Sequence, residues 1–124
     1  MSKGLEKRCT ETRPWGKFEQ FTQGEPSTVK ILTINPRQAL SLQYHQRRTE
    51  FWKVISGRAK VTVGDIVSSA REGDEFFIAQ GQNHRIQSGS LAIKVLEISF
   101  GDFDENDIVR LEDKYNRHAE KENS

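Results

Sequence analysis

The chain has 124 residues, a length that suits one domain and is short for two of ordinary size. Apolar residues make up 34% and charged residues 30%, so any core is compact and has a very polar exterior. Because 19 basic and 18 acidic residues leave a net charge of +1, no overall field attracts nucleic acid or an anionic membrane, and we expect neither partner. No apolar run has the length of a signal peptide or a transmembrane helix, which predicts a cytoplasmic location.

Residues 1–12 are mostly polar and predict a flexible N-terminal arm. The single cysteine, Cys9, lies in this arm and has no second cysteine with which to form an internal disulfide. We interpret Cys9 as a thiol without a functional role.

From Phe18 to Phe100, short apolar-rich runs alternate with turn residues, which is the pattern of an all-β sandwich or barrel. Gly64-Asp65, between two short apolar runs, predicts a two-residue hairpin turn. No helical period competes with this pattern, and the number of runs suits a small closed barrel. The predicted strands are, in chain order, 17–22, 28–34, 39–45, 50–56, 59–63, 66–70, 75–78, 84–87 and 91–100.

After Asp102 the composition changes. The polar segment 104–107 is typical of a helix start, and Ile108, Leu111 and Tyr115 have helical spacing along one face. We therefore expect a short C-terminal helix packed on the barrel. The predicted organisation is an arm at 1–12, one domain at 13–117 and a disordered tail at 118–124.

Four polar side chains on the predicted strands form a candidate metal site. Because side chains alternate across a strand, Gln43 and His45 point to the same face. The short connection 46–49 brings Glu50 beside that pair, and His84, after a Gly-rich turn, can supply a fourth ligand from a distant strand. A lone histidine is more often structural than a ligand, but two imidazoles, one carboxylate and one amide oxygen together suit a borderline divalent ion.

These segments resemble the two motifs of the cupin family, which implies a jelly-roll barrel, also called a double-stranded β-helix. Gln43, His45, Glu50 and Gly57 follow the first motif, His-x-His, Glu, Gly, with Gln in the first His position. The second motif is carried by Gly73, Gly81 and His84, and the departures from the family pattern are Arg37 for Gly, Ala79 for Pro and Ser88 for Asn.

Further segments resemble one subfamily, the type II mannose-6-phosphate isomerase domain, over about residues 13–117. Gln in the first ligand position is a mark of this subfamily, whose domain usually ends bifunctional enzymes that also make GDP-mannose. Since only a dozen residues precede Arg13 and no Gly-rich nucleotide loop is found, we expect a stand-alone domain without guanylyl transfer. The resemblance is carried by Arg13-Pro14-Trp15-Gly16, Leu40-Ser41-Leu42-Gln43, Arg48-Thr49-Glu50-Phe51-Trp52 and the segment 107–113.

The resemblance implies an enzyme that interconverts mannose 6-phosphate and fructose 6-phosphate by moving a proton between C2 and C1 through an enediol. One divalent metal ion, with zinc first and Mn, Co, Ni or Fe as alternatives, would polarise the carbonyl. A positioned base would move the proton. Arg48 matches an arginine of the family's metal motif and is one candidate catalytic residue. The other candidate is Glu97, whose side chain points to the inner face of its predicted strand. A structural ion pair with a neighbouring Arg or Lys would explain a carboxylate at this position equally well.

A sugar phosphate as substrate calls for Arg or Lys at the mouth of the barrel. Arg13 and Arg110 are the first candidates because they lie in family-like segments, and Arg47 and Arg85 are further ones. Trp15 could stack on a face of the sugar.

Two other functions stay open. The family usually has histidines where this chain has Gln46, Arg47 and Phe51, which favours a non-catalytic cupin that binds a sugar or a sugar nucleotide. A cupin dioxygenase with an open iron site is the second alternative and would need an apolar substrate pocket. We also expect a homodimer, because pairing of edge strands covers exposed ladder groups.

Overall fold

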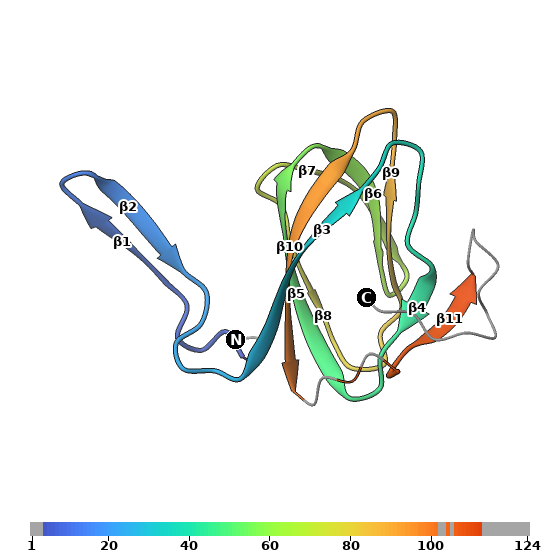
Figure 1. Cartoon of the computed structure of the whole chain (residues 1–124), viewed down its shortest axis with the longest axis horizontal. Coiled ribbons are helices and arrows are strands. Elements are labelled where there is room, and N and C mark those ends of the chain that lie inside the picture. The colour runs from blue at the N-terminus through green and yellow to red at the C-terminus, as the bar shows by residue number, and fades with distance from the viewer. Residues whose placement is uncertain (1–3, 102–103, 105, 113–124) are drawn as a thin grey trace.

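The computed structural model describes residues 4–101, 104 and 106–112, and every regular element in them is a strand (Figure 1). This confirms the all-β class. No helix capable of crossing a bilayer occurs in this part of the chain. The strands are β1 (Cys9–Arg13), β2 (Gly16–Gln20), β3 (Ser27–Ile34), β4 (Leu42–Tyr44), β5 (Arg48–Ser56), β6 (Arg58–Val63), β7 (Ile66–Arg71), β8 (Glu75–Ile78), β9 (His84–Ser88), β10 (Ile93–Gly101) and β11 (Val109–Glu112).

Two antiparallel sheets enclose the main core. The first has the strand order β3-β10-β5-β8 and the second β11-β4-β9-β6-β7. The core lies between them, where Trp52 and Val95 of the first sheet meet Val61 and Ile86 of the second. The expected closed barrel is wrong in one respect, because no continuous hydrogen-bond ladder joins the two sheets in the described residues. Side-chain packing between the facing sheets holds such a jelly roll together.

A second apolar cluster lies on the outer face of the first sheet. Alternation along β10 turns Ile98 and Phe100 away from the main core, and they pack with Phe51 and Leu5. Gly4 lies so close to the Phe100 ring that a Cβ atom on it would be 2.4 Å from a ring carbon. The chain before the first strand therefore contributes to the packing of the sheet, although the sequence analysis placed it in a flexible arm.

Strands β1 and β2 form a hairpin that projects from the two larger sheets (Figure 1). Their register runs from Cys9 opposite Gln20 to Arg13 opposite Gly16. Strand β1 was not predicted, and the domain boundary expected after residue 12 falls inside it. Cys9 is exposed on this hairpin.

The expected C-terminal helix is not found in the described residues. Val109 and Arg110 instead pair with Tyr44 and Gln43 of β4, which makes β11 an edge strand of the second sheet. Ile108 and Arg110 are buried, whereas Val109 between them is half-buried. This alternation in burial is typical of a strand, whose side chains point to opposite faces in turn. Pairing with β4 has overridden the weak local preference for a helix. Tyr115, the third residue of the predicted helical face, lies outside the described residues.

Candidate metal centre

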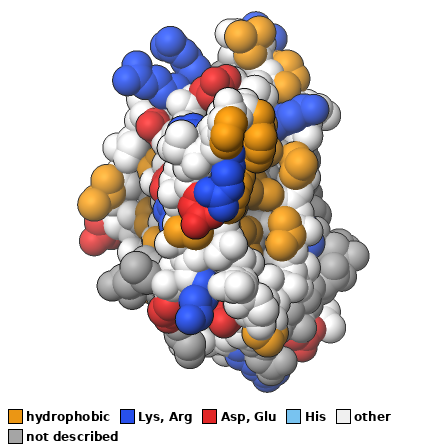
Figure 2. Space-filling view, turned by 90° about the vertical axis from the view of Figure 1, so that its left-hand side faces the viewer, with side chains coloured by type: hydrophobic (Ala, Val, Ile, Leu, Met, Phe, Trp, Pro, Cys, Tyr) orange, Lys and Arg blue, Asp and Glu red, His pale blue; other side chains and the backbone are white. Residues whose placement is uncertain are grey.

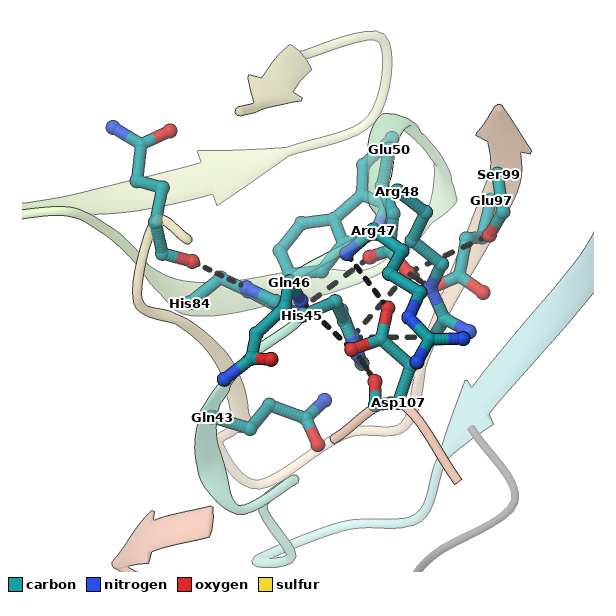
Figure 3. Close-up of polar contacts among 12 residues, drawn as sticks. Gln43, His45, Gln46, Arg47, Arg48, Glu50, His84, Glu97, Ser99 and Asp107 are labelled. Atoms are coloured by element: carbon teal, nitrogen blue, oxygen red, sulfur yellow. Dashed lines mark hydrogen bonds and ion pairs between the residues drawn. The ribbon is translucent and has the colours of Figure 1, made fainter. Parts of the chain in front are cut away.

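His45, Glu50 and His84 form a buried cluster whose ligand atoms all lie within 4.8 Å of one another. His45 follows β4, Glu50 is in β5 and His84 begins β9, so the cluster joins both sheets (Figure 3). Two local features position it. Gln43 pairs directly with His84 across β4 and β9, and the amide of Gly81 donates a hydrogen bond to the carbonyl of His45 at 2.7 Å. The structure thus brings together the three predicted ligands that are histidine or carboxylate.

Both histidines are held with Nε2 toward Glu50. His45 donates from Nδ1 to the carbonyl oxygen of Asp107 at 2.5 Å, and His84 donates from Nδ1 to that of Gln82 at 2.9 Å. A neutral imidazole that gives its proton through Nδ1 carries a free lone pair on Nε2. The Nε2 atoms of His45 and His84 lie 3.5 and 3.6 Å from the two carboxylate oxygens of Glu50. Backbone carbonyls that orient ligand histidines in this way are typical of metal sites.

The protonation states favour a cation in the centre of the cluster. Burial is the main cause that lowers the pKa of His45 to about 3, and the nearby His84 ring and the Arg48 guanidinium add to it. Burial also lowers the pKa of His84 to about 4. Both rings are therefore neutral near pH 7 and are electron-pair donors. Burial raises the pKa of Glu50, while the Arg48 guanidinium opposes that rise.

Two atoms of the cluster lack a hydrogen-bond partner among the described residues: Nε2 of His84 and Oε1 of Glu50. They are fully buried and 3.6 Å apart, which is too long for a hydrogen bond between them. Buried polar atoms without a partner are costly and rare in native proteins. A divalent cation accepts lone pairs from both atoms, so the donor set fits a metal ion.

Arg48 is 1% exposed and adjoins the cluster from β5. Its Nε donates to Oε2 of Glu50 at 3.0 Å, and its terminal nitrogen lies 3.2 Å from Nε2 of His45 (Figure 3). Ser99 of β10 also donates to Oε2 of Glu50, at 3.5 Å. The Glu50 carboxylate is therefore oriented by two donors on one oxygen, which leaves its other oxygen toward His84.

Glu97 of β10 lies behind Glu50 and is 2% exposed. Its Oε2 accepts a hydrogen bond from Nε1 of Trp52 at 3.2 Å, and its Oε1 has no hydrogen-bond partner among the described residues. Burial and the negative charge of Glu50 raise the pKa of Glu97 to about 7. Among the described residues Glu97 forms no ion pair with a basic side chain, and its buried neighbours are the Trp52 indole and the Glu50 carboxylate.

Gln43 and Arg110 flank the cluster as cross-strand neighbours. Gln43 is 2% exposed, and its Oε1 accepts a hydrogen bond from Ser41 at 3.1 Å. Arg110 of β11 pairs with Gln43 and is 7% exposed. An arginine this buried beside a candidate metal ligand is unusual for a solvated surface charge.

The other predicted substrate contacts lie elsewhere. Arg13 bonds Glu11 and stacks over the ring of Phe18, while Trp15 is 72% exposed at the turn of the hairpin. Figure 1 places this hairpin and strands β4 and β9 on opposite sides of the chain. Arg85 is engaged by the carbonyl of Leu40 and by Glu112.

Asp107 is a site residue that the sequence analysis did not single out. Its carbonyl oxygen orients His45, and its carboxylate accepts the backbone N–H groups of Gln46 and Arg47 at 2.8 and 2.9 Å. Although burial opposes the change, these two N–H groups lower the pKa of Asp107. The only signal in the sequence was its place at the start of the family-like segment 107–113.

Pockets open on the surface at different places. A pocket of about 260 Å³ adjoins the cluster and is lined by Gln46, Arg47 and Asp107, among others. A larger one of about 710 Å³ lies over β6 and β7, where Lys60 and Ser69 line it. Neither pocket is lined by His45, Glu50 or His84 themselves, but the smaller one includes Asp107, whose carbonyl binds His45. The chemistry of the donor set points to the smaller pocket as the approach to the metal centre.

Several proteins are similar in sequence to most of this chain. Xanthan biosynthesis protein XanB of Xanthomonas campestris pv. campestris is 41% identical over 107 residues, which are 85% of this chain and 23% of XanB. Mannose-1-phosphate guanylyltransferase ManC of Salmonella typhimurium is 36% identical over 107 residues, 85% of this chain and 22% of ManC. The chain therefore spans about a quarter of the length of these relatives.

Solved structures resemble the fold. Oxalate decarboxylase from Bacillus subtilis is 26% identical with a TM-score of 0.63, over 70% of this chain and 24% of that one. A double-stranded β-helix protein from Klebsiella pneumoniae is 25% identical with a TM-score of 0.56, over 73% and 83% of the two chains. The family model described as mannose-6-phosphate isomerase C-terminal matches residues 2–113. The chain belongs to this family of cupin domains.

Proposed function

We propose that this chain is a metal-dependent sugar-phosphate isomerase that interconverts mannose 6-phosphate and fructose 6-phosphate. The observation that carries the proposal is the pair of buried, unpartnered atoms, Nε2 of His84 and Oε1 of Glu50, in a chain of the mannose-6-phosphate isomerase C-terminal family. Because the chain spans about a quarter of its named relatives, the activity of a whole relative does not transfer by itself.

The metal ligands would be His45, Glu50 and His84, with Gln43 as the fourth. Gln43 is supported by its burial and by its position opposite His84 on the adjacent strand. Two imidazole nitrogens and two oxygens are ligands of intermediate softness, and zinc is the first candidate for such a set. Mn, Co, Ni or Fe would also be accepted. When bound, the metal would act as a Lewis acid on the carbonyl of the sugar.

Glu97 is our candidate for the base that moves a proton between C1 and C2 of the sugar. It is buried beside Glu50, and its Oε1 is not engaged by another described group. Arg48 suits a different role from the base expected from the sequence. A guanidinium that already donates to Glu50 stays charged, so Arg48 would orient Glu50 and stabilise negative charge on the substrate oxygens.

Arg110 is our candidate for the phosphate, because it adjoins Gln43 on the strand next to the metal centre. Arg47 lines the small pocket and is the second candidate. Arg13 and Trp15 stay predictions from the sequence, and they could reach a substrate only if the hairpin that carries them met another copy or moved.

A non-catalytic sugar-binding cupin is the alternative, and one observation bears on it. The histidine that the family usually has at position 51 would lie on the outer face of β5, where Phe51 packs against Phe21 with ring centroids 5.6 Å apart. Its loss therefore removes no group from the metal side of the sheet. The replacements at Gln46 and Arg47 still favour the alternative, because both lie next to His45.

The test combines metal analysis with an isomerase assay on mannose 6-phosphate. The purified protein should hold about one divalent ion per chain and turn over, Glu50→Ala should lose both metal and turnover, and the exposed Glu72→Ala should keep both. Glu97→Gln should keep the metal and lose turnover. A metal-loaded wild-type protein without turnover would favour the binding cupin, and a metal-free but active one would refute the proposed site.

A further inference from the structure

Three basic side chains gather on the outer face of the second sheet. Arg58 and Lys60 belong to β6 and Arg71 ends β7, and all three are exposed. Within the described part of the chain, none of the three side chains forms an ion pair. Figure 2 shows Lys and Arg side chains gathered at the upper end of the molecule, where β6 begins and β7 ends in Figure 1. Cations without partners on one face leave a local positive charge.

The register of β6 and β7 sets two of these cations opposite each other. Arg58 is the direct partner of Arg71, and Lys60, two residues further along, is the partner of Ser69. Opposed residues on antiparallel strands share a face with their Cβ atoms about 5 Å apart, and like charges in this arrangement repel each other. An anion bound between the two guanidinium groups would remove the repulsion.

A groove runs past this arginine pair. On one side it is the pocket of about 710 Å³, where Ser69 and Gln87 lie in one row with Lys60 across the sheet. On the other side it is a pocket of about 580 Å³, lined by Leu91, which is 70% exposed. The two arginines and Gly89 line both pockets, so the pockets are parts of one groove.

The charges that line the groove favour an anion. Three basic residues face two acidic ones, Glu72 and Asp74. The carboxylate of Asp74 already accepts the backbone N–H of Arg71 at 2.9 Å. The groove therefore has a net positive charge, and its cations lie close together beside the arginine pair.

We propose that this groove binds an organic diphosphate, such as a nucleoside diphosphate, at a site separate from the metal centre. Two neighbouring phosphates match two guanidinium groups, because each guanidinium can donate paired hydrogen bonds to one phosphate. Lys60 adds a third charge, and the organic part of the ligand lies along Leu91. The metal centre is at the other end of β6, where Val63 pairs with His84. Arg58 is five residues from Val63, which is about 17 Å along a strand.

Calorimetric titration with ADP and with inorganic pyrophosphate tests the proposal, at low ionic strength because salt screens exposed charges. Both should bind to the wild-type protein. Lys60→Gln should weaken binding about tenfold, and the double variant Arg58→Gln/Arg71→Gln at least about 100-fold. Lys17→Gln is the matched control, since Lys17 is an exposed lysine of the hairpin, and it should bind as the wild type does. Circular dichroism verifies that the variants are folded.

Two further variants test how the ligand lies in the groove. Glu72→Gln should tighten the binding of both ligands severalfold, because it removes a negative charge beside the phosphates. Leu91→Ser should weaken the binding of ADP and leave that of pyrophosphate unchanged. If ADP binds no more tightly than pyrophosphate, the organic part of the proposal is wrong.

The proposal is overturned if neither ligand binds at millimolar concentration, or if the arginine double variant binds as the wild type does. The metal-site variant Glu50→Ala should bind ADP with unchanged affinity. Loss of binding in Glu50→Ala would place the ligand at the metal centre and would also overturn the proposal. None of these outcomes depends on isomerase activity, so this inference and the proposed function can fail separately.

Discussion

Two glycines with nearly the same backbone conformation differ in what surrounds them. Gly57, between β5 and β6, has a φ of 90°, and Gly73, in the turn after β7, has a φ of 92°. A Cβ atom on Gly57 would be 2.4 Å from the carbonyl oxygen of Ala92 and 3.0 Å from Cα of Ile93, whereas one on Gly73 would meet nothing within 4 Å. Replacing each by alanine thus separates backbone strain from a steric clash.

The two variants share every energetic term except the clash. A left-handed backbone costs a non-glycine residue about 1–2 kcal/mol, and the lower entropy of unfolded alanine offsets about 0.4–1 kcal/mol of it. Gly73→Ala should therefore lower the free energy of unfolding by about 1 kcal/mol. Gly57→Ala also pushes against backbone atoms that cannot rotate away, which adds about 1–3 kcal/mol. Its total cost is about 2–4 kcal/mol.

Urea unfolding followed by tryptophan fluorescence measures both values. Trp52 is 1% exposed in the core and Trp15 is 72% exposed, so the signal change reports mainly the loss of the core around Trp52. At about 4 °C per kcal/mol for a domain of this size, melting temperatures give a second reading. Equal losses for the two variants would refute the reasoning, because they would show that β10 makes room beside Gly57.

Two further predictions concern the metal and the loop before β4. Zinc at about 100 times its dissociation constant should stabilise the wild-type protein by about 2.7 kcal/mol and raise its Tm by about 10 °C, with no rise for His84→Ala. An equal rise in both proteins would mean that the ion binds elsewhere. Arg37 has a φ of 57°, at the position where the family pattern has glycine. Arg37→Gly should relieve about 1–2 kcal/mol of strain against about 0.5–1 kcal/mol of entropy, a net gain of up to about 1 kcal/mol in urea titrations. A net loss would show that the contacts of the Arg37 side chain outweigh the strain.

The central strands could be predicted because their signal is local. Along β5, Glu50, Trp52 and Val54 are buried and point inward, and alternation alone places them on one face. The same rule placed Gln43 and His45 on one face, and the short connection 46–49 predicted Glu50 beside them. It failed at the two ends of the chain. The segment with Val109 and Leu111 fits a helix as well as a strand until β4 pairs with it, and β1 has the composition of a solvated arm.

The sequence by itself predicted the all-β class, most of the strands and the three residues of the buried His45, Glu50 and His84 cluster, because alternation, turns and motif spacing are properties of neighbouring residues. Only the tertiary structure decided how the site is arranged. The carbonyl that fixes His45 belongs to Asp107, 62 residues away, and the donors that orient Glu50 come from Arg48 and the distant Ser99. It also decided that Arg13 and Trp15 lie on a projecting hairpin rather than beside the cluster. Contacts between segments far apart in the chain depend on how the whole sandwich closes, and no local pattern encodes them.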